Sequence, residues 1–167
     1  MNTKNNAVFL DRDGVINLKR DDYVKSVEEF VMLKDVPYAI KLLNENNYLV
    51  IIITNQSAIN RGLLTDQELC NIHEFMKNEL GKDGAHVDAI YHCPHRPDEN
   101  CSCRKPETEL VERAVTEHSV LIESSWFIGD SEMDMSSAKK MGLRGIKIKE
   151  NSGLLEPVKK ILDSKKK

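Results

Sequence analysis

The sequence predicts a single α/β domain built around a doubly wound parallel sheet. Short runs of β-branched and apolar residues alternate with helical patterns along the 167 residues. Several of these runs are almost wholly apolar, which is expected of parallel strands that helices cover on both faces. In such folds, catalytic groups gather at the carboxyl ends of the strands. The polar residues that follow each run are therefore the first candidates for a functional site.

Five apolar runs have the length and composition of strands. They cover residues 7–10, 48–54, 87–92, 125–130 and 145–149. Repeated strand–helix units connect by right-handed crossovers, so we expect one sheet with helices on both faces. No insertion is long enough to form a separate cap domain over that sheet.

The first two expected helices have recognisable ends. Asp35 stands where an N-cap is expected, directly before the apolar pattern that begins at Val36. Thr65 and Glu68 have the spacing of a capping box for the second helix. Gly81 is expected to end that second helix, because glycine is favoured directly after a helix.

Three further helices follow, and the last one sets the boundary of the domain. Leu110 begins the apolar pattern of the third helix, and Gly142 is expected to end the fourth. The final helix is expected over about 153–162. We therefore expect one domain over 1–163 and a solvated basic tail over 164–167.

Composition and charge restrict the kinds of partner. Apolar residues make up 40% of the chain and charged residues 31%, as in globular domains. The formal net charge of -3 and the isoelectric point near 6.0 give no reason to expect a nucleic-acid partner. The apolar run at 49–53 is too short to cross a bilayer, and no signal peptide precedes the first strand. We expect a cytoplasmic monomer that acts on a small molecule, without a membrane partner.

Three of the four cysteines lie in one short segment, CPHRPDENCSCRKP. It contains Cys93-x-His95, five intervening residues and Cys101-x-Cys103. Four thiolate and imidazole ligands suit tetrahedral zinc, and a complete set leaves no open position for water. The sequence therefore predicts a structural Zn²⁺ site in a short loop. Two disulfides are the alternative, which a reducing compartment disfavours; Cys70 is expected to be a buried or half-buried thiol.

Polar residues at the ends of three predicted strands and of the cysteine-rich loop are candidates for one site. They are Asp11, Asp13, Thr54, Lys105, Asp130 and Asp134. Taken one at a time they have structural explanations: an Asp-Gly turn, a capping hydroxyl, a solvated cation and a helix N-cap. Together they supply carboxylates for Mg²⁺, and a hydroxyl and an ammonium for phosphate oxygens. A carboxylate can also attack phosphorus to give an aspartyl-phosphate.

The segments AVFLDRDGVIN, IIITN, RKP and FIGDSEMD resemble, in order and spacing, the four motifs of the haloacid dehalogenase (HAD) phosphatase superfamily. The resemblance covers about 7–150 and implies a HAD-like fold. It implies that Asp11 is the nucleophile and that Asp13 is the general acid and base. Thr54 and Lys105 are implied to hold the transferring phosphoryl group.

The same resemblance implies a Mg²⁺ site. Its ligands would be the carboxylates of Asp11 and Asp130 and the backbone carbonyl of Asp13, with Asp134 supporting them from behind. The chain is thus expected to be a Mg²⁺-dependent phosphomonoester hydrolase that also carries structural Zn²⁺.

Narrower features resemble two families within the superfamily. The stretch NQSAINRG at 55–62, the cysteine-rich loop and the lack of a cap resemble the D-glycero-D-manno-heptose 1,7-bisphosphate 7-phosphatases. The histidinol phosphatases share the zinc loop. The five-residue gap between His95 and Cys101 resembles their loop as much as it resembles that of the heptose enzymes. Ser131 stands where many heptose enzymes have lysine. The expected substrate is heptose 1,7-bisphosphate, with loss of the 7-phosphate, and histidinol phosphate is the alternative.

The side chains expected to hold the rest of the substrate lie in or beside these motifs. They are Arg12, Tyr23, Asn55, Gln56, Ser57, Arg61 and Arg104. Two other classes remain as alternatives: a nucleic-acid 3′-phosphatase and a non-enzymatic zinc-knuckle binding module. Both require a basic surface, and the second also requires aromatic residues around the metal, whereas aromatics make up only 5% of this chain.

Overall fold

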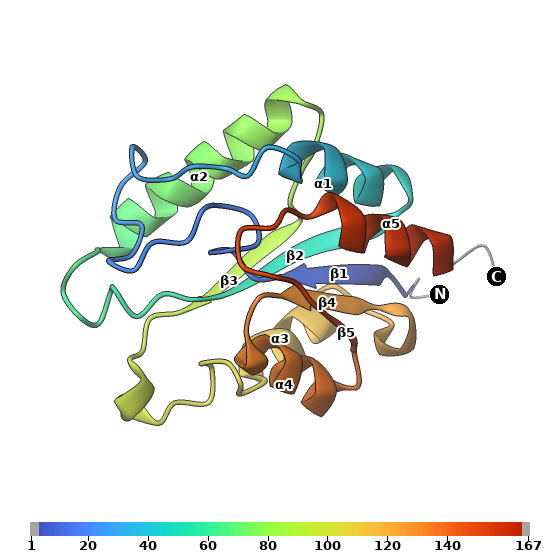
Figure 1. Ribbon diagram of the computed structural model, residues 1–167. Helices are drawn as coiled ribbons and strands as arrows, with labels where there is room; N and C mark the ends of the chain where they lie inside the picture. The colour runs from blue at the N-terminus through green and yellow to red at the C-terminus, as the bar shows by residue number, and fades with distance from the viewer. Residues whose placement is uncertain (1–3, 165–167) are drawn as a thin grey trace.

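Five parallel strands form one sheet at the centre of the computed structural model, which describes residues 4–164 (Figure 1). Their order across the sheet is β3-β2-β1-β4-β5. The strands are β1 (Asn6–Leu10), β2 (Tyr48–Asn55), β3 (Ala89–Cys93), β4 (Trp126–Gly129) and β5 (Arg144–Lys147). Every neighbouring pair is parallel, so the predicted sheet is confirmed.

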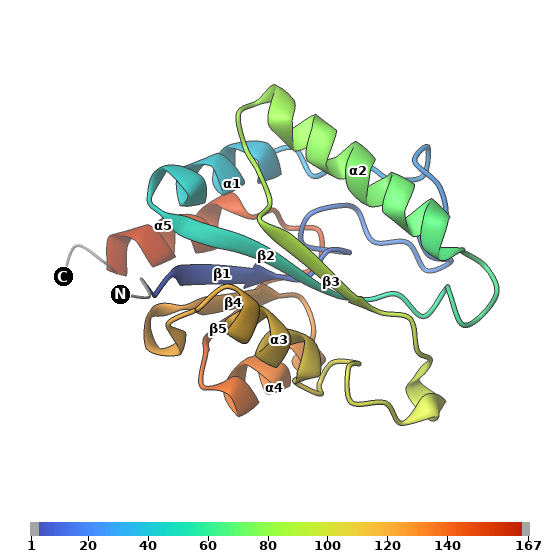
Figure 2. The same cartoon turned by 180° about the vertical axis from the view of Figure 1, so that it is seen from behind.

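Helices cover both faces of the sheet, as the doubly wound fold requires. They are α1 (Val36–Glu45), α2 (Asp66–Lys82), α3 (Glu109–Glu117), α4 (Glu132–Met141) and α5 (Leu155–Ser164), with short 3-10 helices η1 (Pro97–Glu99) and η2 (Ile122–Ser124). α1, α2 and α5 lie on one face, and α3 and α4 lie on the other (Figures 1 and 2). Within residues 4–164 no segment forms a cap domain, and no helix is long and apolar enough to cross a membrane. α5 includes Ser164, the first residue of the predicted tail; residues 165–167 lie outside the described residues.

β1 lies in the middle of the sheet, and its side chains enter two separate parts of the core. Val8 and Leu10 pack toward α1, α2 and α5, while Ala7 and Phe9 pack toward α3 and α4. All four side chains are fully buried. Both faces of this strand are therefore shielded from water, which explains why its sequence lacks polar alternation.

The predicted ends at Thr65 and Gly142 are confirmed, and the one at Gly81 is wrong. The hydroxyl of Thr65 accepts a hydrogen bond from the N–H of Glu68 at 3.2 Å, and the Glu68 carboxylate accepts one from the N–H of Thr65 at 2.8 Å. Gly142 ends α4 in the left-handed conformation. Gly81, however, does not end α2, which continues to Lys82.

Asp35 caps a different helix from the one that the sequence suggested. Its side chain makes no capping hydrogen bond to α1. Instead, its Oδ2 accepts the N–H of Leu154 at 2.9 Å and the N–H of Leu155 at 2.8 Å, at the start of α5. α1 has Pro37 in its first turn, where the missing N–H of proline reduces the need for a cap. The carboxylate is therefore available to a helix that begins more than a hundred residues later.

Asp35→Ala is expected to destabilise the protein by about 1–2 kcal/mol, the usual cost of removing a helix cap. The change leaves the two N–H groups at the start of α5 without their acceptor. Asp35→Asn keeps an oxygen acceptor of the same shape, so it should retain most of the stability. Urea denaturation of the three proteins measures the difference. An alanine variant as stable as the wild type would contradict the capping role.

Candidate active site

A cavity of about 300 Å³ lies at the carboxyl ends of β1, β2 and β4. Residues that the sequence singled out form much of its lining: Asp11, Asp13, Tyr23, Asn55, Gln56, Arg104, Lys105, Asp130 and Asp134. Three further charged residues, Lys19, Arg20 and Asp21, lie on the loop that follows β1. The fold thus brings groups from distant parts of the chain to one place.

Lys105 is buried in the wall of this cavity between two carboxylates. Its Nζ lies 2.9 Å from Oδ1 of Asp11 and 2.6 Å from Oδ1 of Asp134, and it donates a hydrogen bond to the carbonyl of Ile53 at 2.8 Å. Burial alone would lower the pKa of Lys105, but the charges of Asp11 and Asp134 outweigh burial and raise the pKa above its ordinary value. The ammonium is therefore charged at neutral pH.

Asp11 is the first residue after β1, and its ionisation depends on its neighbours. Burial raises the pKa of Asp11 to about 7; the ammonium of Lys105 opposes this effect, and the carboxylates of Asp134 and Asp13 add to it. A further positive charge beside Asp11 would lower its pKa and favour the carboxylate. A divalent cation can supply that charge.

One carboxylate oxygen of each of Asp11, Asp130 and Asp134 lies within 4.8 Å of the other two. Oxygens this close can approach one cation together, and Mg²⁺ prefers oxygen ligands of this kind. Asp134 is already engaged, because its Oδ1 contacts Lys105 and its Oδ2 accepts hydrogen bonds from the N–H and hydroxyl of Ser131 at 3.1 and 2.6 Å. Asp11 and Asp130 are the carboxylates that remain for an ion, with Asp134 behind them.

Two local features bring Asp130 into the cavity. Ser131, rather than Asp130, is the N-cap of α4, and its hydroxyl accepts the N–H of Asp134 at 3.2 Å. On the other side, Gly14 has a φ of 85°, and a Cβ at this position would lie 2.5 Å from Oδ2 of Asp130. Glycine alone allows the turn after β1 to pass this close to the carboxylate.

Asp13 is held by three neighbouring side chains. Its carboxylate accepts hydrogen bonds from Arg12 at 3.0 Å, from Asn17 at 3.0 Å and from Gln56 at 2.9 Å. Burial would raise the pKa of Asp13, but the guanidinium of Arg12 and these hydrogen bonds outweigh burial and hold the pKa below its ordinary value. Asp13 is therefore ionised in this arrangement.

Four residues expected at the phosphate or the substrate lie outside the cavity lining. Arg12 is fully buried behind the carboxylate that it contacts, so it orders that carboxylate and does not face the cavity. Thr54 is also fully buried, and its hydroxyl accepts a hydrogen bond from Nε2 of Gln56 at 2.9 Å. Ser57 is buried and Arg61 is exposed on the loop after β2. Arg12, Ser57 and Arg61 therefore do not line this cavity, and their contacts with a substrate stay a prediction.

The sequence reasoning missed two residues that support Asp13. Asn17 is fully buried in the loop after β1, where no periodic pattern indicates which side chains point inward. His73 is buried on α2, and its Nε2 accepts a hydrogen bond from Arg12 at 3.2 Å. A signal for His73 was present, because it lies between Ile72 and Met76 on the apolar face of the helix.

His73→Gln is expected to change how stability depends on pH. Burial lowers the pKa of His73 from 6.5 to about 3, and the charge of Arg12 adds to this effect. Below pH 6.5 the unfolded chain therefore binds a proton that the folded protein does not bind. Stability should fall as the pH drops toward 3, and His73 alone should cost about 2 kcal/mol between pH 7 and pH 5. Denaturation at both pH values should show a smaller loss for His73→Gln; an equal loss would contradict the prediction.

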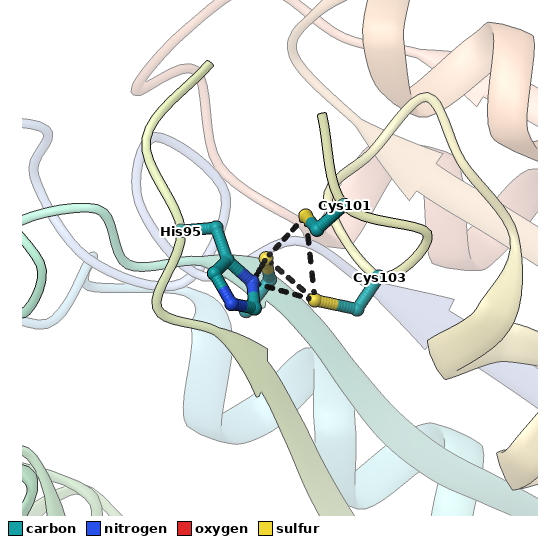
Figure 3. Close-up of side chains that lie close together, drawn as sticks. His95, Cys101 and Cys103 are labelled. Carbon is teal, nitrogen blue, oxygen red and sulfur yellow. Dashed lines mark hydrogen bonds between the residues drawn. The ribbon is translucent and has the colours of Figure 1, made fainter. Parts of the chain in front are cut away.

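The four predicted zinc ligands converge in the loop after β3, where His95, Cys101 and Cys103 point toward one another (Figure 3). Nδ1 of His95 lies 3.2 Å from Sγ of Cys103 and 3.4 Å from Sγ of Cys93, and the three sulfur atoms are 2.8, 3.5 and 3.6 Å apart. A tetrahedral zinc shell has ligand–ligand distances of roughly 3.3–3.8 Å. The contact between Cys93 and Cys103 is shorter than that, while the other four distances lie in or close to this range, so a small separation of these two sulfur atoms lets the cluster hold a metal ion. All four cysteines are free thiols, and Cys70, expected to be buried or half-buried, is exposed on α2.

The cysteine cluster and the cavity share a wall. Arg104 and Lys105 directly follow Cys103, and Nη1 of Arg104 donates a hydrogen bond to the carbonyl of His95 at 3.1 Å. Asn55, at the end of β2, accepts the N–H of Lys105 at 3.0 Å and donates to its carbonyl at 3.2 Å. A metal ion in the cluster would therefore fix the directions in which Arg104 and Lys105 point.

Known proteins resemble this chain along most of its length. Residues 102–162 match the HAD-hydrolase-like family. The D-glycero-β-D-manno-heptose-1,7-bisphosphate 7-phosphatase of Helicobacter pylori strain J99 is 41% identical over 156 residues, which cover 93% of this chain and 85% of that protein. The protein of the same name from Pseudomonas putida is 38% identical over 147 residues, which cover 87% of this chain and 83% of that protein.

A solved structure agrees with the sequence relatives. The D,D-heptose 1,7-bisphosphate phosphatase from B. bronchiseptica, complexed with magnesium and phosphate, has a TM-score of 0.83 and 30% identity, and the match covers 95% of this chain and 99% of that chain. These relatives, the clustered carboxylates with their buried lysine, and the cysteine cluster agree in one conclusion. The chain is a phosphatase of the HAD superfamily and belongs to the family of the heptose-1,7-bisphosphate 7-phosphatases.

Proposed function

We propose that this chain removes the 7-phosphate of D-glycero-D-manno-heptose 1,7-bisphosphate in a Mg²⁺-dependent reaction that passes through an aspartyl-phosphate on Asp11. The observation that carries the proposal is the contact of Lys105 with both Asp11 and Asp134, beside the third carboxylate of Asp130. Phosphoryl transfer requires a nucleophile, a fixed positive charge and a divalent-cation site close together. The names of the relatives support the choice of substrate.

In the first step, an oxygen of Asp11 attacks phosphorus, and the bond between phosphorus and the sugar oxygen breaks. The departing oxygen takes a proton from Asp13, so that an alcohol leaves. Lys105 neutralises charge on the phosphoryl oxygens, and Asn55 holds its backbone in place. Hydrolysis of phosphate monoesters is among the slowest uncatalysed reactions, so this neutralisation is the main task of the site.

In the second step, a water molecule attacks the phosphorus of the aspartyl-phosphate. Asp13 takes a proton from the water, and Asp11 leaves as a carboxylate while inorganic phosphate is released. Asp13 is ionised once it has given up its proton in the first step, and its low pKa in the free protein also favours the carboxylate, so the group is available to accept a proton from the water. For the first step Asp13 must carry a proton, and we expect the bound phosphate dianion to raise its pKa, because like charges disfavour the ionised form.

The carboxylates of Asp11 and Asp130 and the carbonyl of Asp13 would hold Mg²⁺, with Asp134 behind them. When bound, the ion withdraws charge from the phosphate oxygens and favours the ionised form of Asp11. The engagement of both Asp134 oxygens by Lys105 and Ser131 supports a positioning role for Asp134.

The cysteine cluster is assigned a structural Zn²⁺ ion. Its ligands would be Cys93, His95, Cys101 and Cys103. Four protein ligands leave no position for water, so the ion takes no direct part in the chemistry. The thiols must stay reduced, which supports a cytoplasmic enzyme. Every proposed group comes from one chain, and we propose a monomer as the active form.

Arg104 is the residue that we assign to the second phosphate of the substrate. It lines the cavity, and its bond to the carbonyl of His95 orients the guanidinium in the cavity wall. A guanidinium offers N–H groups in a fork that matches two phosphate oxygens. Because the chain lacks a cap domain in the described residues, loops of this kind must hold the part of the substrate that does not react.

Arg104→Ala is expected to lower kcat/KM for the bisphosphate about tenfold more than for a monophosphate ester, because only the bisphosphate uses the guanidinium. Steady-state kinetics with both substrates measure this difference. Arg113→Ala, on α3 and paired with Glu117, removes the same charge away from the cavity and serves as the control. Equal losses of kcat/KM on both substrates would indicate that Arg104 binds the phosphate that reacts, and would contradict its assigned role.

Phosphate release from a small panel of substrates tests the proposed function. The panel contains heptose 1,7-bisphosphate, histidinol phosphate and a 3′-phosphorylated oligonucleotide, each with Mg²⁺, with EDTA and with Ca²⁺. We expect the highest kcat/KM on the bisphosphate and activity only with Mg²⁺, because Ca²⁺ prefers more ligands at longer distances. A preference for either other substrate would overturn the assignment of the substrate, and full activity in Ca²⁺ alone would contradict the metal site.

A further inference from the structure

Lys19 brings a positive charge to a carboxylate that the proposed function assigns to the metal. Its Nζ lies 3.2 Å from Oδ2 of Asp130 and 3.0 Å from Oε2 of Glu150. The side chain of Asp130 is 3% exposed, whereas those of Lys19 and Glu150 are 41% and 49% exposed. The ammonium therefore lies at the mouth of the cavity, between one buried carboxylate and one solvated carboxylate.

The backbone of Lys19 is fixed even though its side chain is partly exposed. Its N–H donates a hydrogen bond to Oδ1 of Asn151 at 3.0 Å, and the N–H of Asn151 donates to the carbonyl of Gly14 at 2.9 Å. Glu150 directly precedes Asn151, so one loop after β5 supplies both the backbone anchor and the second carboxylate. The ammonium thus stays within reach of Asp130 and Glu150 while the backbone keeps its place.

Two lysines neutralise the three clustered carboxylates, and they differ in mobility. Lys105 contacts Asp11 and Asp134, is almost fully buried, and donates a further hydrogen bond to a backbone carbonyl. Lys19 contacts Asp130 and reaches solvent. A divalent cation on Asp130 would meet the ammonium of Lys19 at the same carboxylate, where like charges repel each other strongly. Of the two lysines, Lys19 is the one that can move away.

We propose that Lys19 is a displaceable counter-ion of the metal site. Its ammonium neutralises Asp130 until a divalent cation binds there, and Glu150 then holds the ammonium at the mouth of the cavity. The inference rests on the proposed function, because it takes Asp130 as a ligand of Mg²⁺. It follows that a lysine outside the ligand set lowers the affinity for Mg²⁺, and that metal binding frees a positive charge where the phosphate ester enters.

Calorimetric titration of the 167-residue protein with MgCl₂, without substrate, tests this exchange. Lys19→Gln removes the competing ammonium and should lower the Kd for Mg²⁺ by about fivefold. Glu150→Gln removes the group that receives the ammonium and should raise the Kd by about threefold. The double variant should bind as tightly as Lys19→Gln, because Glu150 acts through Lys19. Thermal melting confirms that the variants, changed at partly exposed positions, are folded.

Lys147 and Glu132 supply the matched control, because they form another exposed ion pair at the same edge of the sheet but do not line the cavity. Their glutamine variants carry the same charge changes and should alter the Kd by less than about twofold. Unchanged or weaker binding by Lys19→Gln would overturn the proposal. Single effects that simply add in the double variant would overturn it too, since they indicate through-space electrostatics. If the wild type binds no Mg²⁺, the proposed metal site itself is wrong. That result is distinct from the two outcomes that contradict only the role of Lys19.

Discussion

Asp11→Asn is expected to reduce phosphate release by at least about 10³-fold while the protein remains folded. The amide keeps the shape of the side chain but lacks the negative charge that attacks phosphorus. A 10³-fold loss corresponds to about 4 kcal/mol of transition-state stabilisation. Lys105 remains paired with Asp134 in this variant, so the ammonium is not left without a counter-ion.

Asp13→Asn distinguishes the two carboxylate roles. It should be similarly damaging with a sugar phosphate, because the departing oxygen then lacks its proton donor. With p-nitrophenyl phosphate, whose leaving group needs no proton, Asp13→Asn should still release a first burst of p-nitrophenol, after which slow hydrolysis of the aspartyl-phosphate limits turnover. Asp11→Asn should give no burst. Pre-steady-state kinetics with p-nitrophenyl phosphate, steady-state kinetics with the sugar phosphate, and circular dichroism to check the fold make the comparison. Retention of more than roughly a tenth of the wild-type turnover by Asp11→Asn would rule out covalent catalysis at this residue.

Cys103→Ser is expected to lose the proposed Zn²⁺ ion, lower the melting temperature and reduce kcat/KM by about 10–100-fold. Serine is a poor zinc ligand, and the three remaining ligands lie in a loop that the metal would otherwise close. Arg104 and Lys105 follow Cys103 directly, so a loosened loop displaces both positive groups from the cavity. Asp11 is unchanged in this variant. The loss of kcat/KM therefore comes from the displacement of the positive charges of Arg104 and Lys105.

Cys70→Ser is the control for this experiment, because Cys70 is an exposed thiol on α2, outside the cluster. It should keep one zinc ion per chain and full activity. Metal analysis, thermal melting and kinetics of both variants provide the three measurements. A zinc-free Cys103→Ser protein with unchanged kcat/KM and melting temperature would show that the cluster has no part in ordering the cavity wall.

The elements that the sequence predicts well are those whose pattern is local. β1 has four consecutive buried apolar residues. A strand that is covered on both faces has an uninterrupted apolar sequence, which is easy to recognise. Thr65 and Glu68 satisfy each other within one helical turn, so their spacing alone identifies the start of α2. The Cys93 to Cys103 cluster was predictable for the same reason, because its four ligands lie within eleven residues.

The features that the sequence did not reveal depend on contacts between distant segments. Asp35 has the position of a cap for α1, but its carboxylate accepts a hydrogen bond from the N–H of Leu154 instead. Arg12 adjoins two predicted active-site carboxylates, yet burial against His73 turns it away from the cavity. Lys19 lies in a loop without periodicity, so its contact with Asp130 emerges only when that loop is folded.

The central place of β1 has a consequence for the order in which the protein can be made. β1 is synthesised before the other four strands, but Val8 pairs with Val50 on one side and with Trp126 on the other. The second edge of β1 therefore stays unpaired until β4 has been made. α5 is synthesised after all five strands, and its Val158 and Ile161 complete the core on the face of α1. Such long-range pairing slows folding. The chain loses conformational entropy when a large loop closes, and it does so before the strand contacts lower the free energy. A nascent chain that has not yet released α5 therefore presents an uncovered apolar face to chaperones and to aggregation.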